Sequence, residues 1–231
     1  MNERSNRMKR IALLVPSSNL VMEADFHRGL AGLPVSVQTA RMYLTENTRE
    51  QEVEMVEVHA ARAALDLRTT QPDLLVFGCT SAGSLGGLSY DRAIAERLAS
   101  ICGCQTVGVI SSVTAALDAG GLQKVAVLTP YNEDLTDAVA GSVRESGREV
   151  VIAKGMGIVD NVATGEVTPA EVIAFAREAV GDSQVDGLFF SCTNLRSLEA
   201  VPDLEREFGL PVVTSNRATL AAVKARLDLA A

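Results

Sequence analysis

Two cysteines of this 231-residue chain stand in segments that repeat each other. Residues 73–85 read DLLVFGCTSAGSL and residues 186–198 read DGLFFSCTNLRSL, so Cys79 and Cys192 are equivalent positions 113 residues apart. Each cysteine ends an apolar run and begins a turn of small or polar residues. Such turns leave backbone N–H groups free, which favours an anion such as a carboxylate and lowers the pKa of a neighbouring thiol. The pair predicts one cleft in which two thiols act as nucleophile or as acid and base.

A second repeat brings further polar side chains to strand ends. Residues 10–19 (RIALLVPSSN) match residues 124–132 (KVAVLTPYN) at an offset of 114 residues. Tyr131 directly follows the second of these strands, where its hydroxyl could donate to a substrate oxygen. Asn19 and Asn132 occupy the same turns, but asparagine is also an ordinary turn residue.

The remaining cysteines and the histidines do not form a recognisable site. Cys102 and Cys104 make one Cys-Gly-Cys motif, but a zinc site needs further Cys or His ligands and the chain has only two His. We interpret both cysteines as structural, and we assign no catalytic role to His27 or His59. The sequence therefore predicts no metal.

The elements that position these residues alternate along the chain. Continuous apolar runs indicate strands buried on both faces, and their alternation with amphipathic stretches indicates parallel βαβ units. Strands are expected at residues 11–15, 35–39, 74–77, 106–110, 125–128, 150–153, 187–190 and 212–214. The expected helices include residues 50–68, 90–100, 135–146 and 169–181.

The repeat predicts an α/β fold of two halves, each a small doubly wound parallel sheet. The first half is expected to comprise residues 1–114 plus 218–231, because the chain crosses back, and the second half residues 115–217. Ligands of open parallel sheets bind beyond the carboxyl ends of the strands. The active site is therefore expected between the halves, where the equivalent strand ends converge.

Charge and hydropathy exclude several classes of protein. The formal net charge of −8 argues against nucleic acid or an anionic membrane as a partner, since both attract clustered Lys and Arg. No apolar run approaches the ~18 residues of a membrane span. The polar residues 1–10 lack the features of a signal peptide. We expect a cytoplasmic protein with reduced cysteines.

Together these motifs resemble the aspartate/glutamate racemase superfamily and, within it, the maleate cis-trans isomerase branch. The resemblance implies two α/β halves related by a pseudo-twofold axis, an isomerase without cofactor or metal, and a homodimer. The matching pieces span most of the chain: VPSSNLVME at 15–23, GCTSA at 78–82, TPYN at 129–132, GIVDN at 157–161 and SCTNLRSL at 191–198.

The resemblance also implies a role for each site residue. Cys79 matches the nucleophile, Cys192 its acid–base partner, and Tyr131 a residue that contacts a carboxylate or assists proton movement. Asn19 and Asn161 match residues that hold substrate. The expected substrate-binding set is completed by the polar residues that follow the two cysteines, Thr80, Ser81 and Thr193.

The expected reaction converts maleate, or a similar small cis-dicarboxylate, to fumarate. Cys79 as thiolate adds to one alkene carbon, which turns the double bond into a single bond that can rotate. Elimination of Cys79 then gives the trans product, while Cys192 supplies or removes a proton. Covalent addition of this kind replaces one difficult step by two easier ones.

Other functions stay open at this point. A two-cysteine racemase would exchange the α-proton of an amino acid without an adduct, and a non-catalytic carboxylate-binding protein would need no reactive thiol. Arylmalonate decarboxylases keep only the second cysteine and have Gly at the first, so Cys79 counts against decarboxylation. Ectoine-degradation proteins look similar and are not separated by motif. We expect residues 44–51 to cover the site, and we favour a surface position for Arg196 over contact with a second carboxylate.

Overall fold

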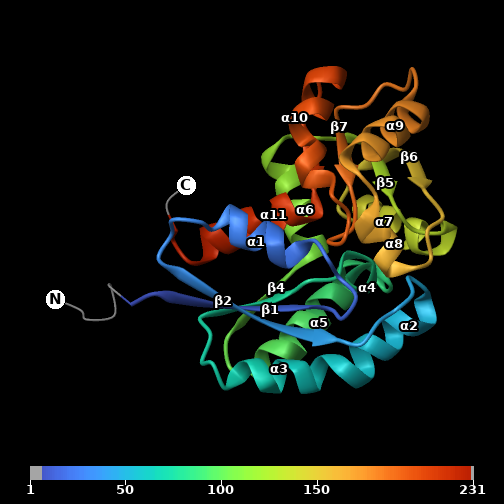
Figure 1. The fold of residues 1–231 in the computed structure, drawn as a ribbon. Helices are drawn as coiled ribbons and strands as arrows, with labels where there is room; N and C mark the ends of the chain where they lie inside the picture. Colours follow the sequence, from blue (N-terminus) through green and yellow to red (C-terminus); the bar gives the residue numbers. More distant parts are fainter. Residues whose placement is uncertain (1–6, 230–231) are drawn as a thin grey trace.

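Two four-stranded parallel sheets organise the chain, which a computed structural model describes for residues 7–229 (Figure 1). The strand orders are β2-β1-β3-β4 and β6-β5-β7-β8. Each half therefore places its four strands in the same spatial order, with its first and third strands at the centre of the sheet. The neighbouring strands of both described sheets pair in parallel. This confirms the predicted α/β class with two similar halves.

The strands are β1 (Lys9–Pro16), β2 (Val35–Met42), β3 (Leu74–Phe77), β4 (Gln105–Gly108), β5 (Lys124–Thr129), β6 (Glu149–Gly155), β7 (Gly187–Phe190) and β8 (Val212–Thr214). The helices are α1 (Met22–Gly29), α2 (Arg49–Glu54), α3 (Ala60–Arg68), α4 (Thr80–Ser84), α5 (Gly87–Cys102), α6 (Val109–Ala119), α7 (Glu133–Glu145), α8 (Asn161–Glu166), α9 (Pro169–Val180), α10 (Ser197–Phe208) and α11 (Ser215–Arg226). A π-helical turn, η2 (Met55–His59), joins α2 to α3.

Two of the predicted elements differ from the structure. The strand expected at 106–110 ends at Gly108, and the next two residues begin α6. Val109 and Ile110 are fully buried at the start of α6. A short apolar run of this kind is compatible with a buried strand end or a buried helix start, so hydrophobicity could not distinguish them. The helix expected at 50–68 is interrupted by the π-helical turn η2.

Alternate side chains of β1 enter two different cores, as expected for a strand covered on both faces. Ile11, Leu13 and Val15 pack into a core that continues through the second half of the chain. Ala12 and Leu14 face the opposite way, into a separate core closed by η2, α3 and α5. The first of these cores joins the two halves into one packed unit.

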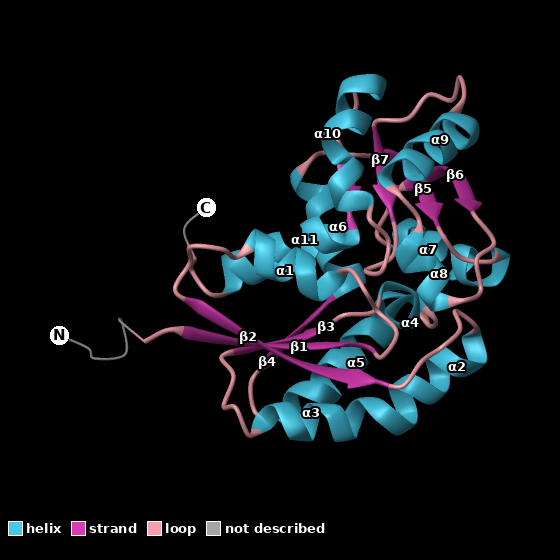
Figure 2. Ribbon diagram, in the orientation of Figure 1, coloured by secondary structure: helices cyan, strands magenta, loops and turns pink. Residues whose placement is uncertain are grey.

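Two helices carry the chain between the halves (Figure 2). After β4 the chain passes through α6 into the second sheet, and after β8 it returns through α11, which packs against α6 and α1. The boundaries predicted at 114/115 and 217/218 fall inside these helices, and the division into 1–114 plus 218–231 and 115–217 stays a prediction. The two ends of the predicted first half, residues 1–6 and 230–231, lie outside the described residues.

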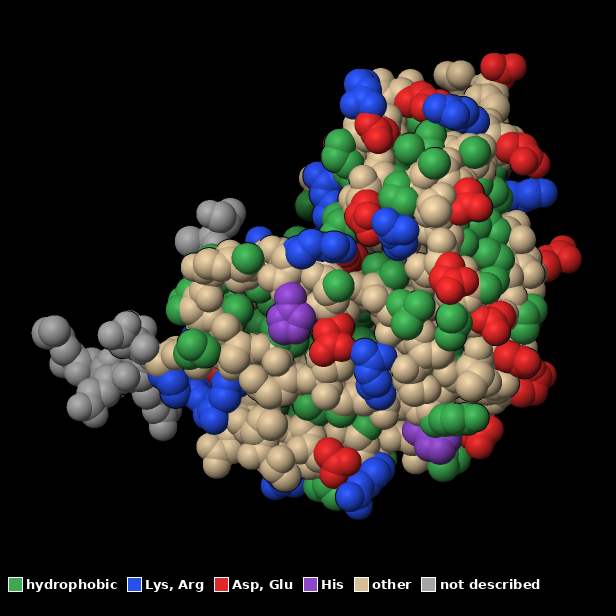
Figure 3. All heavy atoms as spheres, viewed as in Figure 1, with side chains coloured by type: hydrophobic (Ala, Val, Ile, Leu, Met, Phe, Trp, Pro, Cys, Tyr) green, Lys and Arg blue, Asp and Glu red, His purple; other side chains and the backbone are tan. Residues whose placement is uncertain are grey.

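The surface is polar and mixed in charge. On the face drawn in Figure 3, acidic and basic side chains are interspersed and do not gather into a basic patch. Within residues 7–229 no helix is long and apolar enough to cross a membrane.

The repeated aspartates, Asp73 and Asp186, join the first and third strands of each half. The carboxylate of Asp73 accepts a 2.8 Å hydrogen bond from the backbone N–H of Arg10. In the second half, Asp186 accepts from the backbone N–H groups of Lys124 (2.8 Å) and Gln123 (3.1 Å). The sequence repeat thus retains Asp because each half uses it to hold the start of its first strand.

We predict that Asp186→Ala lowers the free energy of unfolding by about 1 kcal/mol, because two backbone N–H groups lose a charged acceptor. Urea denaturation followed by circular dichroism measures this loss. Asp182→Ala is the matched control, since Asp182 lies in an exposed loop nearby. Equal midpoints for the two variants would contradict the assigned role of Asp186.

Candidate active site

Cys79 lies between the end of β3 and the start of α4, where it is 5% exposed. The residue before it has to be glycine, because a Cβ at Gly78 would lie 2.7 Å from Sδ of Met22 and 2.8 Å from the carbonyl oxygen of Leu14. This close approach to β1 lets the Gly78 N–H donate to Leu14 (2.7 Å). The thiol is thereby held at the carboxyl edge of the first sheet.

Cys192 occupies the equivalent place after β7, but its backbone differs. Its φ of 104° lies in a region that residues other than glycine rarely adopt, at a typical cost of about 1–3 kcal/mol. Neighbouring hydrogen bonds hold this conformation. The Cys192 N–H donates to the hydroxyl of Ser215 (3.1 Å), and the Asn194 N–H donates to the Cys192 sulfur (3.2 Å).

Hydrogen bonds between the two halves join the two cysteine turns directly. The Thr193 hydroxyl donates to the carbonyl oxygen of Gly78 (2.9 Å), the residue before Cys79. The hydroxyls of Thr80 and Ser215 share a hydrogen bond of 2.9 Å, and Ser215 in turn accepts from Cys192. The equivalent strand ends therefore meet at one site between the halves, as the sequence predicts.

Asn19 connects the end of β1 to the second cysteine turn. Its Oδ1 accepts from the N–H groups of Val21 (3.0 Å) and Met22 (2.9 Å), so it shapes the entry to α1. Its Nδ2 donates to the Thr193 hydroxyl (3.0 Å). Asn19 is 2% exposed and lies beside the second cysteine turn, at the site where the sequence analysis expects it to hold substrate.

Asn161, at the start of α8, forms a hydrogen-bonded cluster with Ser18 and Asn194. Its Nδ2 donates to the hydroxyl of Ser18 (2.8 Å), and its carbonyl and Oδ1 accept from Nδ2 of Asn194 (2.5 and 3.2 Å). Asn194 also accepts from the Leu20 N–H (2.7 Å). The sequence analysis did not assign Ser18 or Asn194, because their roles depend on contacts between segments more than 140 residues apart.

Tyr131 reaches Cys192 from the carboxyl end of β5. Its side chain is 1% exposed, and burial together with the neighbouring thiols raises the pKa of its hydroxyl well above the usual range. The Tyr131 hydroxyl acts to lower the pKa of Cys192 and so stabilises the Cys192 thiolate.

Both cysteine thiols have a raised pKa, which corrects the lowering expected from their turns. Burial raises the pKa of Cys192 to about 11, although Tyr131 and the backbone N–H groups of Asn194 and Leu195 act in the opposite direction. Burial also raises the pKa of Cys79 well above its usual range, against the Ala82 N–H. Loss of hydration outweighs the backbone N–H groups because both thiols are almost completely enclosed.

One group at the site, Glu52 of α2, was missed by the sequence analysis. It is fully buried and accepts a hydrogen bond from the Ser81 hydroxyl, and its burial raises its pKa to about 8. A signal was available, since the buried Met55 and Val56 follow at helical spacings of three and four residues. That spacing places Glu52 on the apolar face of its helix.

The segment 44–51 is held against the second half, as expected for a loop that covers the site. The Asn47 N–H donates to Val159 (2.7 Å), and the Asn161 N–H donates to Thr45 (3.0 Å). These contacts join the segment to residues 159 and 161 of the second half, and its coverage of the site stays a prediction.

The other candidate residues lie outside the site. Cys102 ends α5 and Cys104 directly precedes β4, at the amino edge of the first sheet. Arg196 pairs with Glu199 (2.9 Å) and is 36% exposed, which confirms the surface position. His27 is exposed on α1. Among the described residues, no three His, Cys, Asp or Glu side chains gather in a way that could hold a metal ion.

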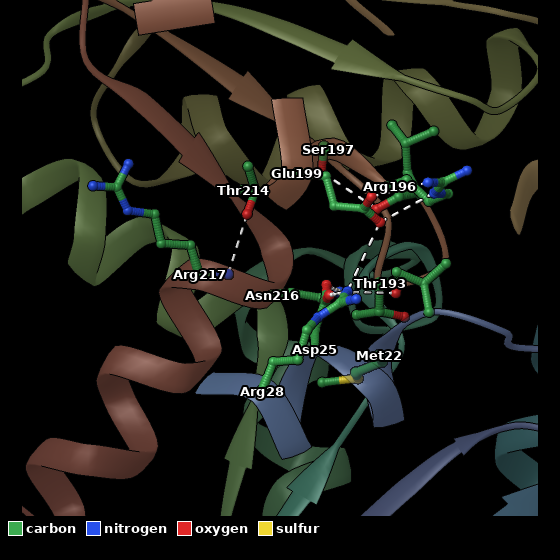
Figure 4. Close-up of polar contacts among 12 residues, drawn as sticks. Met22, Asp25, Arg28, Thr193, Arg196, Ser197, Glu199, Thr214, Asn216 and Arg217 are labelled. Atoms are coloured by element: carbon green, nitrogen blue, oxygen red, sulfur yellow. Dashed lines mark hydrogen bonds and ion pairs between the residues drawn. The ribbon is translucent and has the colours of Figure 1, made fainter. Parts of the chain in front are cut away.

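A buried polar cluster supports the turn of Cys192 through a contact with the next residue, Thr193 (Figure 4). Nδ2 of Asn216, in α11, donates to the carboxylate of Asp25 (2.7 Å) and to the carbonyl oxygen of Thr193 (3.1 Å). Asp25 is 1% exposed and also pairs with Arg28, which extends toward Glu199. The cluster thus ties α1 and α11 to the residue that follows Cys192.

Comparison with known proteins identifies relatives of this chain. A family model described as arylmalonate decarboxylase matches residues 14–231. The maleate isomerase of Geobacillus stearothermophilus is 30% identical over 234 residues, which cover 95% of this chain and 92% of that protein.

Solved structures show the same similarity. A variant of the maleate isomerase Iso from Pseudomonas putida, crystallised with maleate, has a TM-score of 0.87 and 27% identity, covering 95% of this chain and 92% of the other. A variant of the maleate cis-trans isomerase of Nocardia farcinica has a TM-score of 0.87 and 28% identity, covering 95% and 93%. The latter carries a covalently bound succinylcysteine intermediate.

We predict that Asn216→Ala lowers the free energy of unfolding by about 2 kcal/mol, because a buried carboxylate and a buried carbonyl lose their donor. Arg28→Ala is the control, since it removes only the exposed partner of Asp25 and should cost less than about 1 kcal/mol. Urea denaturation compares the two variants. A larger loss for the arginine variant would be inconsistent with this role for Asn216.

Proposed function

The chain belongs to the arylmalonate decarboxylase family and is related over nearly its whole length to maleate isomerases, and from this premise we propose that it converts maleate to fumarate without a cofactor. The observation that carries the proposal is the pair of buried cysteines, Cys79 and Cys192, in turns from the two halves that are joined by hydrogen bonds. A succinylcysteine in a relative supports covalent chemistry at one such cysteine.

In the first step Cys79 acts as the nucleophile. Its thiolate forms a bond to one alkene carbon of maleate, and the electron pair of the double bond moves to the other alkene carbon and its carboxylate. Cys192 then donates its proton to that second carbon. A pKa of about 11 suits this role, because at neutral pH Cys192 begins as the protonated thiol. The product is a succinyl thioether on Cys79 and a thiolate at Cys192.

The second step reverses the first after rotation about the new single bond. The Cys192 thiolate removes the proton, the double bond forms again, and the bond to Cys79 breaks to release fumarate. Tyr131 stabilises the transient Cys192 thiolate through its hydroxyl, and a pre-placed donor of this kind typically contributes about 3 kcal/mol. Each proton that leaves a group returns to it, so the cycle needs no other reactant.

The buried amides supply the substrate contacts in this proposal. Asn19 and Asn161 border the cysteine turns from the two halves, and each has amide hydrogen-bonding capacity beyond its contacts with protein. The hydroxyls of Thr80, Ser81 and Thr193 are bonded to other protein groups, so their contribution to substrate binding would come from backbone N–H groups. These assignments, the homodimer and the cytoplasmic location remain predictions.

We predict that the purified protein converts maleate to fumarate and that Cys79→Ala reduces turnover at least about 1000-fold, since no other thiol occupies the attacking position. Proton NMR follows the vinyl signals of the two isomers directly. Cys104→Ala, at the opposite edge of the sheet, should retain the activity. A fully active Cys79→Ala variant would sink the mechanism.

We further predict that Cys192→Ser accumulates a succinyl-sized adduct on Cys79 when incubated with maleate. A serine hydroxyl ionises far less readily than a thiol and offers no basic form at neutral pH, so removal of the proton from the adduct becomes the slow step. Mass spectrometry of digested protein locates the adduct. If amino acids exchange their α-hydrogen with solvent deuterium and maleate leaves no adduct, the protein is a racemase instead.

A further inference from the structure

The mechanism needs a group that takes the proton from Cys79, and Glu52 meets the geometric requirements. This side chain from α2 is 0% exposed, so its carboxyl group has no contact with solvent. Its Oε1 accepts a hydrogen bond from the Ser81 hydroxyl. Its Oε2 has no hydrogen-bond partner in the described structure, although buried carboxyl oxygens normally have one.

Ser81 connects this carboxyl group to the thiol. The Ser81 hydroxyl lies 3.8 Å from the Cys79 sulfur, within hydrogen-bonding distance for sulfur, and the serine is 1% exposed. Carboxylate, hydroxyl and thiol therefore form a continuous chain that is closed to water. In such a chain, one proton can pass from the thiol to the serine as the serine proton passes to the carboxylate.

The charges around Glu52 restrict where a negative charge can lie. Arg49 on the same helix stabilises the carboxylate and Asp134 of α7 opposes it. Glu52 in turn opposes ionisation of the neighbouring groups Cys79, Cys192 and Tyr131. A thiolate at Cys79 is therefore much less costly when Glu52 is protonated than when it is charged.

We propose that Glu52 is the proton acceptor that activates Cys79, acting through the hydroxyl of Ser81. The proton of the Cys79 thiol moves to Ser81, the Ser81 proton moves to Oε1 of Glu52, and the electron pair of the S–H bond remains on sulfur. The pair carries one negative charge before and after the transfer. When Cys79 leaves the product, the thiolate regains a proton by the reverse path.

This inference rests on the proposed function for its place in turnover, but the reactivity of Cys79 can be measured without substrate. Burial raises the pKa of Glu52 to about 8, so the carboxylate form that accepts the proton is present above this pH and lost below it. Cys79 reactivity should therefore rise with pH around a midpoint near 8. Without the acceptor, Cys79 must ionise by itself, and burial, the largest cause of its raised pKa, still opposes the thiolate.

The test is the pH dependence of Cys79 alkylation by iodoacetamide, read by peptide mass spectrometry, together with the pH profile of maleate turnover. For Glu52→Gln we expect the alkylation midpoint to move upward by at least about one pH unit and turnover at neutral pH to fall about 100-fold, a typical contribution of general base catalysis. The alkylation rate of each variant is compared with the rate of the same variant at other pH values. Differences between variants in the access of iodoacetamide to Cys79 therefore cancel. Glu54→Gln, an exposed position on the same helix, should behave like the unmodified protein.

A second pair of variants keeps the test decisive if Glu52→Gln does not fold. Ser81→Ala removes the connecting hydroxyl and should shift the midpoint as Glu52→Gln does, whereas Ser81→Thr keeps a hydroxyl and should restore a midpoint near 8. An unchanged alkylation profile in Glu52→Gln or Ser81→Ala overturns the proposal. A shifted profile in a protein that does not isomerise maleate would leave the Glu52 role intact and reject only the proposed function.

Discussion

The hydrogen bonds between the two cysteine turns are the interaction on which the site depends. Thr193 reaches the backbone just before Cys79, and Ser215 connects Thr80 to the backbone N–H of Cys192. The bonds from Thr193 to Gly78 and between Thr80 and Ser215 join residues from different halves of the repeat, and the bond from Cys192 to Ser215 extends the second of them to the other cysteine. The halves can therefore not separate without exposing unpaired polar groups, so the spacing between the thiols is set by the same contacts that hold the protein together.

Enclosure of the site has an electrostatic consequence. Cys79, Cys192, Tyr131 and Glu52 are all buried, and burial raises the pKa of every one of them. Because each charge opposes the others, the site carries little negative charge of its own. Such a site tolerates a dianionic substrate far better than one that already holds two thiolates. In the proposed chemistry the charge moves between groups and is not created anew.

The two halves are similar in topology but differ in the surroundings of their cysteines. Cys79 precedes a short helix and lies next to Ser81, whereas Cys192 has a positive φ and a thiolate that the Tyr131 hydroxyl stabilises. The position equivalent to Tyr131 in the first half is Ser17, whose hydroxyl donates to Leu44. A symmetrical fold thus provides two thiols in different environments, as a nucleophile and an acid–base partner require.

The sequence by itself determined the parts that depend on local pattern. Continuous apolar strands predicted parallel sheets, and the repeated Cys-Thr turns predicted that Cys79 and Cys192 converge, because ligands bind beyond the carboxyl ends of the strands and the equivalent strand ends of the two halves meet at one site. Only the tertiary structure decided the protonation of the site. The turns predicted lowered thiol pKa values, but burial by distant segments outweighs them, and Glu52 becomes part of the site through its contact with Ser81. Helical spacing places Glu52 on an apolar face, but the groups that it contacts and the degree to which the thiols are enclosed depend on how distant segments pack together.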